Sequence, residues 1–179
     1  MNETDQTLPA NIAWPAILLH LKKKKLVPFL GAGASLGLNG SMGLPSGGAL
    51  ARALASECGY PGLDTSDLLR VSQFYALQFG ETPLRTSIQE KLALPDVQPG
   101  EVHKIMAGWP IEAVITTNYD NLMERAFAMA GKDPAKAMYN RFGDQEQIKT
   151  IPTVHTPLVY KLHGSLEAID SMVITEDHY

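Results

Sequence analysis

Apolar and polar positions along this chain form two kinds of pattern, short apolar runs and longer segments of helical period. Three short runs, residues 26–30, 111–117 and 158–162, predict buried strands, and a shorter run at 172–174 predicts a fourth. Apolar positions that recur every three to four residues predict helices at 15–24, 46–58, 65–79, 83–94, 101–107 and 119–130. No element is assigned to the polar stretch 133–150, and Thr175 is expected to cap a further helix. Strands that alternate with helices are typical of an α/β fold with a parallel sheet.

The order of these elements indicates how the domain is organised. The strand at 26–30 runs into the glycine-rich sequence GAGAS, and a helix follows, which is the opening of a nucleotide-binding α/β fold. Helices without strands fill residues 65–108, so we expect a helical insertion there within one domain spanning 1–179. The expected fold class is therefore α/β, with a Rossmann-like parallel sheet flanked by helices. Because an open sheet of this kind usually has about six strands, we expect a fold truncated at its C-terminus, the amino-terminal part of a longer protein.

Composition and charge narrow the function classes. The chain has 179 residues, of which 45% are hydrophobic and 19% charged, as in an ordinary soluble globular protein. A net charge of −4 lacks the basic footprint of direct nucleic-acid binding. A single cysteine, Cys58, excludes an internal disulfide and a cysteine-rich zinc module. The polar, acidic start is unlike a secretion signal, and no apolar stretch approaches the ~20 residues of a membrane helix, so we expect a cytoplasmic protein without membrane contact.

One run of basic residues stands out in a chain whose net charge is −4. Lysines fill positions 22–25, directly after an apolar segment with helical period. Lysines suit the C-terminal end of a helix because they interact favourably with its dipole. A patch for an anionic partner or a membrane surface is the alternative.

The segment GAGAS, residues 31–35, is the first candidate for chemistry. Glycines at a strand-to-helix turn let backbone amides approach a pyrophosphate, with a helix dipole behind them. The segment departs from the dehydrogenase fingerprint, because Leu36 stands in the place of its third glycine and no acidic residue follows about 20 positions later. Hydride transfer is therefore disfavoured. A glycine turn that serves strand-helix packing remains the alternative.

Two more candidate motifs follow the second and third strands. TTNYD places Asn118 and Asp120 at a strand end, where an amide and a carboxylate can contact a ribose, a water or a cationic ring, although helix capping explains them equally well. KLHGS places His163 at the next strand end, and histidine is the commonest general base. In an open α/β sheet, ligands bind at these carboxyl ends. The other histidines lack such a setting: His20, His103, His155 and His178.

Taken in order, the motifs resemble those of one family. GAGAS, GLP, HKIM, TTNYD and KLHGS are similar to the sirtuin series of a GAG loop, a G-I-P turn, an H-x-F/I segment, T-Q-N-x-D and H-G. LVPFLGAGAS, ITTNYDNLMERAF, YKLHGS and MVITEDHY resemble more closely the bacterial sirtuin-like domains of multidomain anti-phage defence proteins, in which the domain hydrolyses NAD. The resemblance extends from Leu26 to the end of the chain.

The resemblance implies a role for each matching residue. Asn118 would contact the nicotinamide-side ribose and position water, Asp120 would contact the nicotinamide carboxamide, and His163 would act as base on a ribose hydroxyl or the attacking water. These three are the expected catalytic residues. The expected NAD-binding residues are Gly31, Ala32, Gly33, Ala34, Ser35, Thr117, Gly164 and Ser165.

The resemblance also implies a function, with alternatives. The expected activity is an NAD glycohydrolase that releases nicotinamide and ADP-ribose as the effector of abortive infection. The expected partners are NAD as substrate, a phage-derived activating signal, and either further copies of the chain or defence-complex proteins. The alternatives are a non-catalytic module that binds NAD or ADP-ribose, a protein deacylase or ADP-ribosyltransferase, and a purely structural fragment. Deacylation is disfavoured because Leu44-Pro45 is not followed by the family's D-F-R, and no zinc module is possible.

Overall fold

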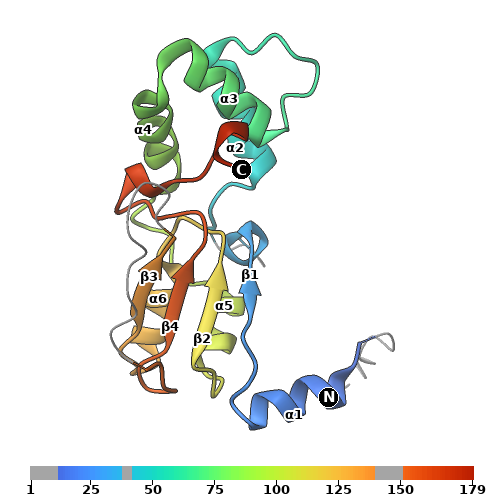
Figure 1. The fold of residues 1–179 in the computed structure, drawn as a ribbon, viewed down its shortest axis with the longest axis vertical. Helices are drawn as coiled ribbons and strands as arrows, with labels where there is room; N and C mark the ends of the chain where they lie inside the picture. The colour runs from blue at the N-terminus through green and yellow to red at the C-terminus, as the bar shows by residue number, and fades with distance from the viewer. Residues whose placement is uncertain (1–11, 38–41, 140–150) are drawn as a thin grey trace.

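The computed structural model describes residues 12–37, 42–139 and 151–179, and it arranges them around a parallel four-stranded sheet (Figure 1). The strand order is β1-β2-β4-β3, and every neighbouring pair is parallel. The α/β fold expected from the sequence is therefore confirmed. The strands are β1 (Phe29–Leu30), β2 (Ala113–Thr116), β3 (Ala135–Met138) and β4 (Leu158–Lys161).

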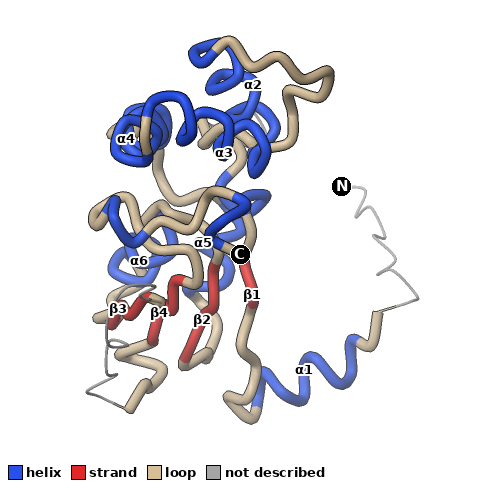
Figure 2. Tube along the Cα trace, turned by 45° about the horizontal axis from the view of Figure 1, so that its top comes forward, coloured by secondary structure: helices blue, strands red, loops and turns tan. Residues whose placement is uncertain are grey.

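Two helices, α5 (Glu101–Ala107) and α6 (Leu122–Met129), cover one face of the sheet (Figures 1 and 2). Side chains alternate between the two faces of a strand, so every second residue of the central strands points toward these helices. Val114 and Val159 pack with the fully buried Phe127 in this way. Burying a phenylalanine side chain stabilises a fold by about 1.5–3 kcal/mol, so this layer anchors the sheet to α6.

A second group of helices lies beyond the carboxyl end of the sheet, at the top of Figure 1. It consists of α2 (Gly47–Cys58), α3 (Leu68–Phe79) and α4 (Glu81–Leu92), which share a separate apolar core. Ser46 begins α2 by accepting a hydrogen bond from the Ala49 amide at 3.2 Å. The helical group thus faces the ends of the strands and can close a site formed there.

The extent of the helical insertion stays a prediction. Helix α2 packs with α3 and α4, whereas α5 packs with α6 beside the sheet. The predicted range 65–108 therefore contains α3, α4 and α5, but it does not coincide with the group of helices that share a core.

The helix α1 (Trp14–Lys22) extends away from the rest of the fold (Figures 1 and 2). None of its residues is buried. Leu18 and Leu19 are each about half exposed. The lysine run begins in its last turn, as the interpretation of a helix end requires. Within residues 12–37, 42–139 and 151–179, none of the helices has both the length and the apolar character needed to cross a membrane.

One predicted strand is wrong. Residues 172–174 form no strand, although their apolar side chains are buried as expected. Only residues 162–171 separate them from β4, and a crossover between parallel strands needs a dozen or more residues. Met172 and Ile174 instead join the core of the helical group, and the hydroxyl of Tyr119 donates a 2.6 Å hydrogen bond to the Val173 carbonyl.

The fourth strand is β3, within the stretch to which the sequence assigned no element. Its sequence AKAM has little β-branched character, and its formation depends on the hydrogen bonds that it makes with β4. The remainder of that stretch, residues 140–150, lies outside the described residues. β1 is shorter than predicted because Pro28, which precedes it, has no backbone N–H to donate. Thr175 is confirmed as an N-cap, of the short 3₁₀ turn Glu176–His178.

Candidate functional site

The glycine-rich segment forms a tight turn directly after β1. Gly31 is extended, and residues Ala32–Ser35 make one turn of 3₁₀ helix. A side chain at Gly33 would meet no atom within 4 Å, and its φ is not in the left-handed region. The surrounding protein therefore does not require glycine at position 33, and the space beside its backbone is open.

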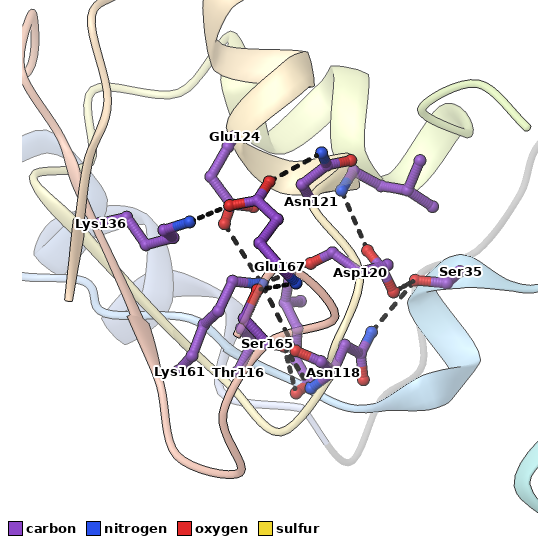
Figure 3. Close-up of polar contacts among 12 residues, drawn as sticks. Ser35, Thr116, Asn118, Asp120, Asn121, Glu124, Lys136, Lys161, Ser165 and Glu167 are labelled. Carbon is purple, nitrogen blue, oxygen red and sulfur yellow. Dashed lines mark hydrogen bonds and ion pairs between the residues drawn. The ribbon is translucent and has the colours of Figure 1, made fainter. Parts of the chain in front are cut away.

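The hydroxyl of Ser35 connects this turn to the end of β2 (Figure 3). It donates a hydrogen bond to Asp120 Oδ2 at 2.8 Å and accepts one from Asn118 Nδ2 at 3.1 Å. The same Nδ2 donates to the carbonyl of Gly31 at 3.0 Å. Both hydrogens of the Asn118 amide are thus directed at the glycine turn. Among the described residues no group donates to its Oδ1, which is left to accept a hydrogen bond from a ligand.

Asp120 also bonds to the start of the helix that follows it, from the position just before the N-cap residue Asn121. Its Oδ1 accepts a hydrogen bond from the backbone amide of Leu122, the first residue of α6, at 3.0 Å. The capping interpretation of the sequence therefore describes one oxygen of this carboxylate, while the other oxygen faces Ser35. Capping and site chemistry are compatible here because a carboxylate oxygen can accept more than one hydrogen bond.

His163 lies in the turn after β4 and lines the same cavity as Asn118 and Asp120. The hydroxyl of Tyr179 is 3.2 Å from each of its ring nitrogens, and the two rings meet edge to face at 83°. Burial lowers the pKa of His163 below its ordinary value, because the surroundings solvate an imidazolium poorly. The ring is therefore neutral at pH 7 and can accept a proton.

One cavity of about 230 Å³ brings these side chains together. Six of the predicted residues line it: Ala32, Ser35, Thr117, Asn118, Asp120 and His163. The other predicted residues do not: Gly31, Gly33, Ala34, Gly164 and Ser165. The rest of the wall is mostly apolar and comes from the helical group and the C-terminal segment, including Leu50, Leu68, Leu92, Val173 and Ile174.

A second cavity of about 380 Å³ adjoins the first. The two share Leu44, Leu92, Tyr119 and Asp120 as lining residues. Since ligand pockets usually measure about 300–1,000 Å³, the first cavity alone suits part of a dinucleotide rather than the whole molecule.

Gly164 and Ser165 have roles in the fold. Gly164 has φ +81°, and a Cβ there would come within 2.3 Å of the Ser171 carbonyl oxygen, so only glycine fits. Ser165 is almost fully buried, and its backbone amide donates a hydrogen bond to Ser171 Oγ at 3.0 Å. Both residues therefore shape the turn that holds His163. Their predicted contact with NAD stays a prediction.

The sequence interpretation missed two buried polar groups beside the site. His103 is 1% exposed on α5, and its Nδ1 has no hydrogen-bond partner among the described residues. Burial lowers its pKa, while the negative charge of Asp120 acts in the opposite direction. Lys161 is fully buried beneath the loop that carries Asn118. The alternation of β4 held the signal for Lys161, because it occupies the same face as the buried Val159.

Within the described residues no three histidine, cysteine or acidic side chains gather as metal ligands would. The arrangement instead offers one amide oxygen, one carboxylate and one neutral imidazole around a partly apolar cavity. Such a set can position a water, remove a proton and stabilise positive charge that develops on a substrate.

Comparisons of the sequence with known proteins identify a family model and several curated proteins that are similar to this chain. Residues 112–179 match the family model described as SIR2-like domain. The chain is 33% identical over 162 residues to the NAD(+) hydrolase ThsA of Enterococcus faecium, which covers 89% of the chain and 32% of that relative. The NAD(+) hydrolase ThsA of Bacillus cereus (strain MSX-D12) is 31% identical over 153 residues, 84% of the chain and 30% of the relative. The NAD(+) hydrolase ThsA of Acinetobacter baumannii (strain 532279) is 29% identical over 167 residues, which is 91% of the chain and 32% of that relative. The chain spans about a third of the length of these curated relatives.

Proposed function

We propose that this chain, whose residues 112–179 match a SIR2-like domain and which is similar to NAD(+) hydrolases, holds the catalytic site of an NAD glycohydrolase. The reaction adds water to the bond between ribose and nicotinamide, giving nicotinamide, ADP-ribose and one proton. The observation that carries the proposal is the single cavity in which Asn118, Asp120 and His163 meet Ser35.

Cleavage of the bond between ribose and nicotinamide needs no general acid to protonate the leaving group. Nicotinamide is attached through a positively charged nitrogen, so it leaves as a neutral molecule when the glycosidic bond breaks. The barrier then depends mainly on stabilising the positive charge that develops on the ribose and on controlling access of water. The carboxylate of Asp120 supplies negative charge at the wall of the cavity. The apolar side chains around it exclude bulk water from the reacting bond.

Asn118 and His163 act on the attacking water in different ways: Asn118 positions it, and His163 accepts its proton. With both amide hydrogens of Asn118 directed at Gly31 and Ser35, its Oδ1 accepts a hydrogen bond from the attacking water or from a ribose hydroxyl. His163 is neutral and accepts the proton that the water loses as the new C–O bond forms. A positioned base of this kind typically contributes about 10²–10⁴-fold to a rate.

The wider role is also a proposal. The names of the relatives give NAD(+) hydrolysis as their activity, and depletion of NAD would make this chain the effector of an anti-phage abortive-infection system. We propose that it acts as part of an oligomer or a defence complex, in response to a phage-derived signal. Resemblance of the sequence motifs is what supports this role.

The proposal is tested on the full-length protein incubated with NAD, alone and with candidate activators, with products identified by mass spectrometry. We expect nicotinamide and ADP-ribose, and we expect Asn118→Ala and His163→Ala each to abolish nicotinamide release while the protein stays folded. Saturable binding of NAD without products would instead indicate a regulatory module. A modified protein acceptor would indicate a deacylase or an ADP-ribosyltransferase.

A further inference from the structure

Lys161 is a charged side chain at a buried position of a strand, where an apolar residue is usual. It is the last residue of β4, it is 0% exposed, and it shares a strand face with Val159, which packs in the core beneath α6. An ammonium group at such a position loses its hydration and must find partners. Its three partners all belong to the segment that runs from the end of β2 into α6.

Two of these partners are backbone carbonyls of the candidate site. Lys161 Nζ donates to the carbonyl oxygen of Asp120 and, at 3.5 Å, to that of Asn118 (Figure 3). The backbone N–H of Asn118 is held as well, because it donates a hydrogen bond to Thr116 Oγ1 at 3.0 Å. Thr116 at the end of β2 and Lys161 at the end of β4 thus hold the backbone of this loop. The side chains of Asn118 and Asp120 extend toward Ser35.

The third partner is Glu124 on α6, whose Oε1 lies 3.2 Å from Lys161 Nζ. Glu124 is only 14% exposed, and burial raises its pKa, against the opposing effect of the Lys161 charge. No group among the described residues donates a hydrogen bond to either of its carboxylate oxygens, so its contact with Lys161 is an ion pair. Glu124 therefore acts as a counter-charge that lets an ammonium reside here.

Buried ion pairs of this kind are a poor means of stabilising a fold. Removing two ions from water costs several kcal/mol, and apolar residues of similar size are often equally stable or more stable in their place. A methionine at position 161 would fill the same volume without that cost. What methionine could not do is replace these contacts, because it has no N–H to donate to the backbone carbonyls of Asn118 and Asp120.

We propose that Lys161 and Glu124 are positioning residues, which fix the backbone carbonyls of Asn118 and Asp120 so that both side chains face the cavity. The inference rests on the proposed NAD cleavage for its catalytic consequence. It concerns geometry, however, and the geometry can be measured without turnover.

The test compares Lys161→Met with the double variant Lys161→Met/Glu124→Leu in the full-length protein. The single variant leaves a carboxylate without its counter-charge, so we expect a lower thermal midpoint and a fall in kcat of tenfold or more. The double variant removes both charges, so we expect its thermal midpoint to return to the parental value or above. We expect its kcat to stay at least tenfold low, with KM changed less than threefold. A double variant that regains parental kcat together with stability overturns the proposal.

A more exposed ion pair outside the cavity and a conservative variant serve as controls. Lys91 and Glu57 form an ion pair between α4 and α2, away from the cavity, and Lys91→Met/Glu57→Leu should leave kcat unchanged. Glu124→Gln keeps an acceptor for Lys161 and leaves both carbonyl contacts in place, so kcat should fall less than threefold. If Lys161→Met does not fold, the double variant decides, and parental kcat in it overturns the proposal.

Hydrogen exchange measured by mass spectrometry gives the readout that does not need NAD. In the double variant we expect faster amide exchange in the peptide covering residues 117–122, and no change there in the Lys91→Met/Glu57→Leu control. Unchanged exchange in the double variant overturns the positioning role even if the parent cleaves NAD. Faster exchange with a parent that never cleaves NAD supports the positioning role and rejects the proposed function.

Discussion

Ser35 and Asp120 are separated by 85 positions in the sequence, yet the hydroxyl of one donates a 2.8 Å hydrogen bond to the carboxylate of the other. The bond joins the glycine turn after β1 to the loop after β2, and these strands are neighbours in the sheet. The same hydroxyl accepts from Asn118. One side chain therefore sets the orientation of both polar residues that lead into the cavity.

Replacing Ser35 with alanine should impair the site more than the fold. The change leaves Asp120 Oδ2 and one hydrogen of the Asn118 amide without this partner, which costs about 1–3 kcal/mol of unfolding free energy. We expect kcat for nicotinamide release to fall tenfold or more, because the side chain of Asn118 is then held only by its bond to the Gly31 carbonyl and Asp120 Oδ2 loses its donor. Chemical denaturation and steady-state kinetics measure the two effects.

Ser87 provides the matched control for that experiment. It too is a buried serine whose hydroxyl donates to a carboxylate, Glu57 at 2.6 Å, but it lies on α4 outside the cavity. Ser87→Ala should lose similar stability and keep its kcat. Equal losses of kcat in the two variants would contradict the role given to Ser35.

The glycines of the site should respond to alanine in opposite ways. At Gly33 the added methyl group meets no atom and the backbone angle is ordinary, so Gly33→Ala should keep or slightly raise the unfolding free energy. If the backbone of Gly33 binds the pyrophosphate as the sequence predicts, the methyl group would obstruct that approach, and the KM for NAD should rise several-fold. Gly164→Ala should be unstable, because its left-handed φ and the nearby Ser171 carbonyl exclude a side chain. Thermal midpoints with kinetics at varied NAD check both, and an unchanged KM in Gly33→Ala would argue against the phosphate role.

The ends of the strands were predictable because their signal is local. An apolar run followed at once by Asn118 or by His163 marks a strand that stops at a polar turn, and in parallel strands such turns gather at one edge. The sheet then brings both residues to one cavity without further information. Their chemical roles stay predictions, since geometry alone does not reveal turnover.

What escaped prediction depends on contacts between distant parts of the chain. β3 has a sequence without strand character and forms through pairing with β4. Residues 172–174 look like a strand but pack against the helical group, because the preceding connection is too short for a crossover. The alternation of β4 places Lys161 on a buried face, but only its contacts with the loop after β2 explain how an ammonium group is accommodated there. Each of these requires the tertiary arrangement.

Asp120 should allow its two functions to be separated. Asp120→Asn keeps an oxygen to accept the Leu122 amide but removes the charge and alters the bond with Ser35. We expect near-parental stability and a kcat about tenfold lower, a smaller loss than in Asn118→Ala. Asp120→Ala also removes the hydrogen bond from the Leu122 amide at the start of α6, which should cost a further ~0.5–1.5 kcal/mol of unfolding free energy. If Asp120→Asn and Asp120→Ala have parental kcat and differ only in stability, the residue is a helix cap alone.

The environment of His163 predicts the acid limb of the pH-rate profile. Burial lowers the pKa of this imidazole below its ordinary value of about 6.5, so the ring is neutral throughout the neutral range. If it accepts the proton of the attacking water, kcat should be constant near pH 7 and fall only at lower pH, with a midpoint below about 6.5. A midpoint at or above that value would contradict the assignment.

The same pKa shift predicts how stability changes with pH. The unfolded chain, with the ordinary pKa, takes up a proton on His163 before the folded chain does, so acid favours unfolding. The contribution of His163 is therefore fully present above pH 6.5 or so, and it is lost as pH falls from there through the lower, folded pKa. His163→Gln has no such proton, and its unfolding free energy should decrease less than that of the parent between pH 7.5 and pH 5, with both values taken from denaturant titrations. Parallel losses in parent and variant would mean that the ring titrates alike in both states, and the acid limb of kcat would then belong to another group.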